Sequence, residues 1–473
     1  MPRVAYLKPL DAKGEAVNAQ GHARRQGRHV DRRAVLGAGV VGAGAFAAWK
    51  VFGGEEKGIP APPERPATWT YAMDGAAAGV SRLSISGGSL YVTADSPLSV
   101  HAVSTGSGRE RWVAEVTGGK QGEAALGPVT VADGTAYVAA EGGHVNASAD
   151  DDGSRRWASE PLGGGPPAAP VVIGSTVCVL METEKAADEA GSTRTLVKGV
   201  LCGLDTDGGR VKWRTEGNRL LLADRSRGQL IAETRGGDRL SAPDADTGDE
   251  RWSLPKQDSV ALGTKLMYAT GSGKVNELAA YDLSTGERRW KSPAPPKEYE
   301  DDPGARLTVS ADGRTVYACE GGSGAVYSYD ATTGDRRWRV TVDSPVTPET
   351  AAGGSALILA SSDGFRAAHS TDSGFQNPFA DGETKPGGYV TGQAASDGKQ
   401  LWRTESNDCT SAPVLTGGQT ALVAHISEMW AYDARTGAPR WRVAGEPEVG
   451  GVPLVADGKL YVITDAGVGA VPA

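Results

Sequence analysis

The sequence is poor in the residues that most often carry catalysis. Its 473 residues include 6 His, 4 Cys and 5 Phe. His101, His144, His369 and His425 each stand alone, and the chain has no His-Glu-x-x-His, Cys-x-x-Cys or Gly-x-Ser-x-Gly sequence. These absences exclude the common zinc-site spacings and the nucleophile elbow of hydrolases. We interpret the four histidines as isolated surface or core residues.

Long hydrophobic runs are also scarce. The apolar run at residues 34–48 directly follows Arg32 and Arg33, and residues 1–33 carry eight basic side chains against three acidic ones. The run is short for a bilayer span, which needs about 20 residues. This pattern, with Ala45-Phe46-Ala47 as a candidate cleavage site, predicts a twin-arginine signal peptide for translocation over residues 1–53. The alternative is an uncleaved anchor formed by residues 34–52.

Both interpretations place the rest of the chain outside the cytoplasm, either secreted or associated with the cell envelope. No cysteine lies near the N-terminal segment, which excludes lipid attachment there. Membrane contact is therefore expected only through this segment, if it stays uncleaved. Residues 54–66, which contain four prolines, predict a linker.

Basic charge is lacking after residue 53. The chain has 49 Lys+Arg and 58 Asp+Glu, and residues 1–53 hold nine and three of these, which leaves 40 against 55. A net charge of about −15 makes nucleic acid and anionic lipid poor partners. We therefore expect no nucleic-acid partner.

Glycine, in contrast, is plentiful and periodic. Eight times a Gly precedes a Trp by four residues, and the clearest copies read Tyr-Asp-x-x-Thr-Gly-x-x-Arg-Trp at 281–290, 329–338 and 432–441. Two short β-rich runs joined by a turn, such as Asp133-Gly134, precede each motif. Each unit thus predicts four antiparallel strands, as in a propeller blade. The tryptophans are predicted to dock neighbouring blades; they are Trp112, Trp157, Trp213, Trp252, Trp290, Trp338, Trp402 and Trp441.

The two ends of this repeat region complement each other. Residues 68–71 read as a lone outer strand, and residues 453–463 read as a blade that lacks one strand. We therefore predict that the N- and C-terminal strands pair and close a ring. The eight motifs and this split blade together count nine units.

The repeated Asp-x-x-Thr-Gly-x-x-x-Trp sequence resembles the PQQ-like repeat of the quinoprotein alcohol dehydrogenase-like propellers over residues 67–473. The resemblance implies an all-β propeller of four-stranded antiparallel blades, and we expect eight blades because the family usually closes at eight. Related in general architecture to WD repeats, the family includes quinone-dependent dehydrogenases and a propeller lipoprotein of the outer-membrane barrel assembly machine. It also includes extracytoplasmic domains fused to bacterial receptor-like kinases.

The resemblance also says what a quinoprotein enzyme of this family would need. Active members typically carry a disulfide between adjacent cysteines beneath the quinone, and a Glu, an Asn and an Asp around calcium. This chain has no adjacent cysteines, and we can align no such triad. We therefore predict no cofactor and no catalytic residues, with PQQ and calcium as the alternative.

Three hypotheses on function follow. The favoured one is a non-catalytic extracytoplasmic scaffold or sensor that binds an envelope or secreted protein. The rival is a PQQ- and calcium-dependent quinoprotein oxidoreductase. The third is a sensor propeller related to the ectodomains of receptor-like kinases, although the chain contains no kinase motif.

Uneven spacing of the tryptophans reveals three insertions, at about 181–200, 292–305 and 364–388. Because propeller strands alternate in direction, these insertions should emerge on one face, where binding sites are usually built. The third insertion brings candidate partner-binding residues, namely Phe365, Phe375, Phe379 and Tyr389. Their alternative role is a small local core that holds a long loop in place.

The four cysteines leave two alternatives open. Cys178 and Cys202 flank the first insertion and form a candidate disulfide, which the oxidising conditions outside the cytoplasm would permit. The alternative is two buried thiols. Cys319 and Cys409 could form a second pair.

Overall fold

Strands make up all the regular secondary structure that the computed structural model describes. No helix in the described part of the chain is long and apolar enough to span a membrane. The predicted export signal, with Arg32 and Arg33, lies outside the described residues. The described residues are 61–73, 80–118, 125–164, 168–186, 196–216, 219–224, 229–233, 239–271, 277–295, 305–320, 324–341, 349–353, 356–362, 388–406, 414–416, 419–424, 428–444, 454–464 and 467–473.

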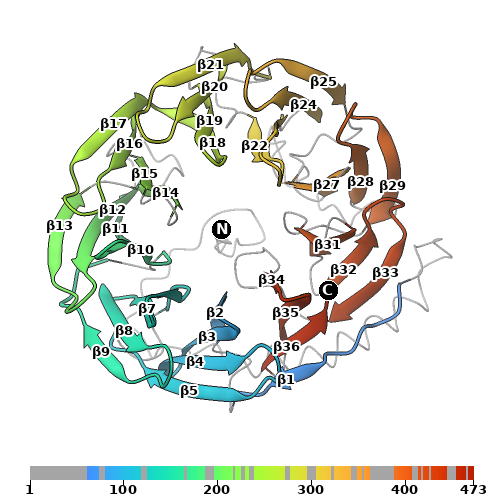
Figure 1. The fold of residues 1–473 in the computed structure, drawn as a ribbon. Coiled ribbons are helices and arrows are strands. Elements are labelled where there is room, and N and C mark those ends of the chain that lie inside the picture. Colours follow the sequence, from blue (N-terminus) through green and yellow to red (C-terminus); the bar gives the residue numbers. More distant parts are fainter. Residues whose placement is uncertain are drawn as a thin grey trace, which may run out of the picture. The chain divides into compact units, whose positions relative to one another are not determined.

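The strands form four-stranded antiparallel sheets, the blades of a β-propeller, and eight of these sheets are built from four consecutive strands (Figure 1). The first four are β2 Val80–Ser86, β3 Ser89–Asp95, β4 Leu98–Ser104, β5 Glu110–Glu115; β6 Thr130–Ala132, β7 Thr135–Ala140, β8 His144–Ala149, β9 Arg155–Ala158; β10 Val171–Ile173, β11 Thr176–Ala186, β12 Leu196–Asp205, β13 Val211–Glu216; β14 Arg219–Asp224, β15 Gln229–Glu233, β16 Arg239–Pro243, β17 Glu250–Pro255. The next four are β18 Gln257–Leu262, β19 Leu266–Gly271, β20 Glu277–Asp282, β21 Arg288–Pro293; β22 Arg306–Val309, β23 Thr315–Cys319, β24 Ala325–Asp330, β25 Arg336–Thr341; β26 Glu349–Gly353, β27 Ala356–Ser362, β28 Gly388–Ala394, β29 Gln400–Ser406; β30 Val414–Thr416, β31 Thr420–Ala424, β32 Glu428–Asp433, β33 Pro439–Ala444.

A further sheet joins the two ends of the repeat region. It consists of β34 Leu454–Ala456, β35 Lys459–Thr464, β36 Gly467–Pro472 and, as its outer strand, β1 Trp69–Tyr71. β1 pairs antiparallel with β36, so that Trp69 lies opposite Ala470. The all-β propeller, its four-stranded blades and its closure by terminal strands are therefore confirmed.

The number of blades differs from the family-based expectation. With the closing blade, the described strands form nine sheets, whereas we expected eight. The count of nine repeat units was the better guide, because every sheet contributes one Trp on its outer strand, including Trp69 on β1.

The burial of each strand follows its place in the blade. The second strands β7, β23 and β31 are buried at every residue, because both of their faces meet neighbouring blades. Their sequences are accordingly rich in Ala, Val and Tyr rather than alternating in polarity. The outer strand β5 alternates between exposed and buried residues after its first position, as expected for a strand with one face in water.

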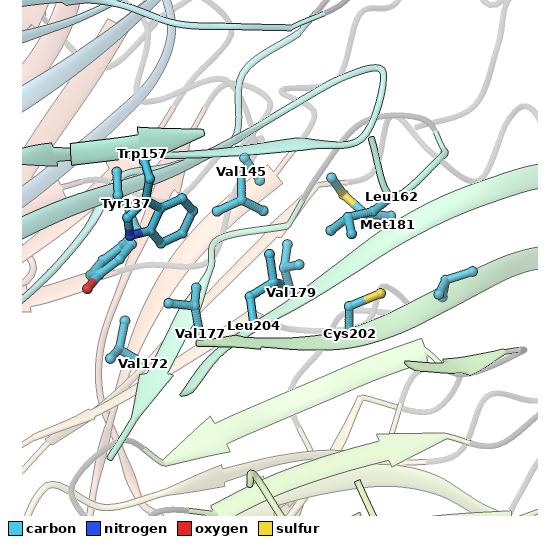
Figure 2. Close-up of a cluster of buried hydrophobic side chains, with 13 residues drawn as sticks. Tyr137, Val145, Trp157, Leu162, Val172, Val177, Val179, Met181, Cys202 and Leu204 are labelled. Atoms are coloured by element: carbon cyan, nitrogen blue, oxygen red, sulfur yellow. The ribbon is translucent and has the colours of Figure 1, made fainter. Parts of the chain in front are cut away.

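The hydrophobic core lies between adjacent blades. In one cluster, Tyr137, Val145 and Trp157 of one blade pack with Val177 and Met181 of the next (Figure 2). Each blade therefore buries its apolar faces against its neighbours, as in other repeat proteins.

The end of the predicted linker is part of this fold. Glu64 forms a parallel bridge with Arg442 on β33, Arg65 N donates to Arg442 O (2.8 Å), and Arg442 N donates to Pro63 O (3.1 Å). Residues 63–65 therefore extend the last blade before the chain enters the closing blade. The composition of residues 54–66 gave no sign of this pairing.

Candidate functional site

The motif tryptophans lie at the junctions between blades. The Trp213 indole N–H donates to Ala245 O (2.8 Å) in the turn of the following blade. Its ring lies against Gly248 of that turn, where an added Cβ would be 2.8 Å from Trp213 Cδ2. Gly248 has a φ of +76°, so the turn also needs glycine for its backbone conformation.

The same arrangement occurs at seven other junctions. In each, the indole N–H donates to a turn carbonyl of the following blade, and the ring contacts the motif glycine of that blade. The pairs are Trp69 with Gly108, Trp112 with Gly153, Trp157 with Gly209, Trp252 with Gly286, Trp290 with Gly334, Trp338 with Gly398 and Trp402 with Gly437. Each motif glycine thus contacts the Trp of the preceding blade and not the Trp of its own motif. The spacing of Gly and Trp within one motif does not reveal this contact.

Four of the basic residues that precede the tryptophans pair with an aspartate of their own turn. Arg337 Nη2 lies 2.7 Å from Asp330 Oδ2, and the hydrogen bond from Arg337 lowers the pKa of Asp330. Arg251 with Asp244, Arg289 with Asp282 and Arg440 with Asp433 repeat this pair. These cations neutralise nearby carboxylates and therefore do not form a free basic stripe for an anionic ligand.

One cluster of polar side chains has the composition of a hydrolase triad. Ser99 Oγ lies 3.0 Å from His101 Nε2, and His101 Nδ1 lies 3.8 Å from Glu110 Oε2. The Tyr71 hydroxyl lies 2.9 Å from His101 Nδ1 and donates a short hydrogen bond to Glu110. Burial lowers the pKa of His101, so its ring is neutral at pH 7.

This cluster is not arranged for nucleophilic catalysis. Ser99 is 3% exposed, and its hydroxyl also hydrogen-bonds to Pro97 O at 3.1 Å, so a substrate carbonyl has no path to Oγ. Tyr71 comes from the closing blade, whereas the other three side chains come from the first blade. The cluster therefore links these two blades, and His101 is a partly buried histidine with a structural role in it.

The cysteines correct one prediction. Cys178 lies opposite Gly203 in the β11–β12 ladder, and Cys202 lies opposite Val179. Because opposite residues share a face and consecutive residues alternate between faces, the two thiols point to opposite sides of their sheet. The predicted disulfide between Cys178 and Cys202 is therefore wrong, and both thiols are free and buried.

Burial also makes these thiols unreactive. It raises the pKa of Cys178 to about 12 and that of Cys202 to about 11. Cys319 is likewise free and buried, so the suggested second pair finds no support at this position. Cys409 lies outside the described residues.

The acidic turn at residues 150–152 is engaged in hydrogen bonds within the propeller. Within the described ranges, no three His, Cys, Asp or Glu side chains are close enough together to hold a metal ion. In the acidic turn at 150–152, Asp150 accepts a hydrogen bond from the Tyr91 hydroxyl and Asp152 accepts one from Ser154 N. These carboxylates are thus used by their own turn and its neighbour.

The described strand ends that flank the three insertions lie at one face of the propeller. Residues 187–195 join the second and third strands of one blade, residues 363–387 do the same in another, and residues 296–304 lead from an outer strand to the next inner strand. These two kinds of connection lie at the same end of the strands. We call this end the insertion face, and the opposite end, with its short glycine turns, the turn face.

The first insertion extends its blade. Pairing between β11 and β12 continues to Ala186 opposite Leu196, whereas the outer strand β13 ends at Glu216 opposite Val200. The inner strand β10 reaches only Cys178. A two-stranded hairpin of five residues on β11, about 15 Å long, therefore projects beyond the blade on the insertion face.

Of the four candidate partner-binding aromatic residues, the structure describes the backbone of Tyr389. Phe365, Phe375 and Phe379 lie outside the described residues. Tyr389 belongs to β28, where its backbone lies opposite Ser361 and Glu405. Their role in partner binding stays a prediction.

Several solved structures are similar to this chain at low sequence identity. BamB from Moraxella catarrhalis has 16% sequence identity and a TM-score of 0.44, covering 78% of this chain and 95% of that chain. Quinohemoprotein alcohol dehydrogenase from Comamonas testosteroni has 13% identity and a TM-score of 0.49, covering 86% and 75%. A europium-containing methanol dehydrogenase has 14% identity and a TM-score of 0.48, covering 84% of each chain. No curated protein sequence matches the chain.

A protein-family model matches most of the chain. The model described as outer membrane protein assembly factor BamB matches residues 61–194, 189–374 and 386–471. These segments contain almost all of the blades and their Trp motifs. The chain therefore belongs to this family of PQQ-like β-propellers.

Proposed function

We propose that this chain is a non-catalytic propeller that works outside the cytoplasm as a scaffold or sensor. It would bind a protein of the cell envelope, or a secreted protein, through its insertion face. The BamB description of the matching family supports a protein-binding role in the envelope. The basic, twin-arginine N-terminal segment supports export, and an uncleaved segment at 34–52 would hold the propeller at a membrane.

The projecting β11–β12 hairpin is the observation that carries this proposal. It extends past both flanking strands on the face where the other two insertions also emerge. The rest of the propeller is a repeated scaffold whose polar motif groups bind one another. A surface that departs from the repeat on one face only is where partner recognition is most readily built.

The chemistry of the described side chains supports a non-catalytic role. The triad-like cluster contains a buried serine, and the three described cysteines have pKa values that burial raises. Four of the arginines beside the tryptophans are paired with aspartates of their own turns. None of these groups combines reactivity with access to a substrate.

The test is affinity capture of the full chain from its native cells after chemical crosslinking, followed by mass spectrometry. One variant lacks residues 366–386, and a second replaces residues 187–195 with a two-residue Asn-Gly turn. The matched control carries Glu287→Ala on the turn face, where Glu287 is exposed. Thermal melting confirms that all variants remain folded.

Loss of the same protein partner from either insertion variant, with retention by the control, supports the proposal. Equal capture by all variants overturns the assignment of the insertion face. Stoichiometric PQQ in the purified protein, together with the absence of a protein partner, overturns the scaffold role and favours the oxidoreductase. Mass spectrometry of bound small molecules in the same samples measures this outcome.

A further inference from the structure

The junction between the last blade and the closing blade is built differently from the others. At the eight junctions described above, a turn between the third and fourth strands supplies both a carbonyl and a glycine to the preceding Trp. The closing blade has no such turn, because its third strand is β36 and its fourth is β1, which lie at opposite ends of the repeat region. Trp441 on β33 therefore has no glycine turn of this kind to contact in the closing blade.

Arg65 contacts the Trp441 ring instead of a glycine turn. Its guanidinium carbon lies 4.9 Å from the centroid of the Trp441 ring, within the range of a cation–π interaction. Arg65 stands four residues before Trp69, which is the spacing between glycine and Trp in every motif. The incoming chain thus supplies an arginine at the motif position where the other blades supply a glycine.

The same segment is attached on both sides of the junction. Toward the last blade, its backbone bonds join residues 63 and 65 to Arg442, whose guanidinium pairs with Glu428. Toward the first blade, the Trp69 indole N–H donates to Thr105 O (3.1 Å), which also accepts from Lys459 Nζ (2.6 Å). Residues 63–71 therefore contact the last, the closing and the first blades.

This attachment is short. β1 has three residues in register with β36, and residues 63–65 add a single parallel bridge. In a typical blade here, the outer strand pairs with its neighbour over five residues and is also tied to it by a short turn, as for β24 and β25. β1 and β36 have no such turn between them, because they lie at opposite ends of the repeat region.

We propose that residues 63–71 form a latch, with Arg65 as the residue that closes it. The latch opens where Arg65 contacts Trp441 and between β1 and β36, while the eight Trp–Gly junctions stay closed. Stacking on Trp441 holds residues 63–65 along β33 and thereby keeps β1 at the edge of β36. This inference does not depend on the proposed function, because it concerns closure of the ring alone.

Hydrogen–deuterium exchange of the full chain tests the latch. The variants are Arg65→Ala, Arg65→Lys and, as a control, Arg435→Ala, which removes an exposed arginine from the turn that follows β32. We expect Arg65→Ala to speed exchange of amides in β1 and β36 by roughly two- to thirtyfold, the range of a cation–π contact. Arg65→Lys should give a smaller increase, because an ammonium keeps the charge but loses the planar stack.

Peptides from β17 and β20, at the Trp252 junction, should keep their exchange rates in all variants. A further variant carries Thr70→Cys and Gly469→Cys, at positions that lie opposite each other, so that a disulfide can join β1 to β36. With this disulfide formed, Arg65→Ala should no longer change exchange in β36. Unchanged exchange in β36 without the disulfide, or an equal increase in every blade, would overturn the latch.

Discussion

Replacing Gly248 with Ala tests whether the contact between a Trp and the following glycine determines the stability of the ring. Two costs are expected. The φ of +76° costs an Ala about 1–2 kcal/mol, because its Cβ crowds the backbone in this region. The added Cβ would also lie 2.8 Å from the Trp213 ring, which adds about 1–3 kcal/mol of overpacking.

The Trp213 ring has little room to yield. On its other side it contacts the backbone of Gly203, which lies opposite Trp213 in the β12–β13 ladder. Its indole N–H is held by Ala245 O at 2.8 Å, and the residue is 9% exposed. Movement away from Gly248 would therefore cost the hydrogen bond or require the two blades to separate.

Gly88 offers a matched control. Its φ is +77°, almost identical to that of Gly248, but no atom lies within 4 Å of an added Cβ. Gly88→Ala should therefore cost only the backbone term of about 1–2 kcal/mol. The difference between the two variants isolates the contact with the tryptophan.

Urea unfolding followed by tryptophan fluorescence measures both variants against the unaltered chain. We expect Gly248→Ala to lose about 2–5 kcal/mol in total, which is about 1–3 kcal/mol more than Gly88→Ala. Equal losses in the two variants would refute the reasoning. They would mean that the glycine is needed for the turn and not for docking the preceding blade.

Three further predictions follow from the same structure. Trp290→Ala should destabilise the ring by roughly 3–5 kcal/mol, because it removes an indole from a junction, and an unchanged melting temperature would contradict this docking role. The fold should lose stability below about pH 4. Desolvation raises the pKa of Asp433, but hydrogen bonds from Arg440 and neighbouring groups outweigh it and lower this pKa to about 2. The folded state therefore binds fewer protons than the unfolded state, and acid favours unfolding. A pH series of melting temperatures measures this loss, and a fold equally stable at pH 2 and pH 6 would contradict it. Iodoacetamide should label Cys178 and Cys202 only after denaturation, and a disulfide-linked peptide pair in the native protein would show that our placement of the two thiols is wrong.

The repeat made the blades predictable from sequence, because glycine turns and tryptophans recur at fixed positions in every unit. The number of blades was harder to predict. Arg65 stands where the motif has its glycine, four residues before Trp69, so this unit does not match the motif. The family's usual count then outweighed the nine units present. The signal that could have corrected this was the distance from Trp69 to Trp112, which is close to one blade.

Contacts within the sheets could not be predicted in the same way. Whether Cys178 can reach Cys202 depends on the register of two strands, and a shift of one residue reverses the face of every side chain. The Tyr71–His101–Glu110 contacts depend on which blade the N-terminal strand joins. The short sequence patterns around these residues do not contain either kind of information.

Closure by the two ends of the repeat region also governs how this protein is made. On the ribosome, Trp69–Tyr71 emerges long before its partner strand Gly467–Pro472, with almost the whole chain between them. Bringing these ends together costs about 5 kcal/mol in loop-closure entropy, apart from a constant. Earlier blades can stack as they emerge, but the nascent chain keeps an unpaired strand edge until the final strand leaves the exit tunnel. During biosynthesis that edge is open to aggregation and to chaperones, and closing it should be the slow last step of folding.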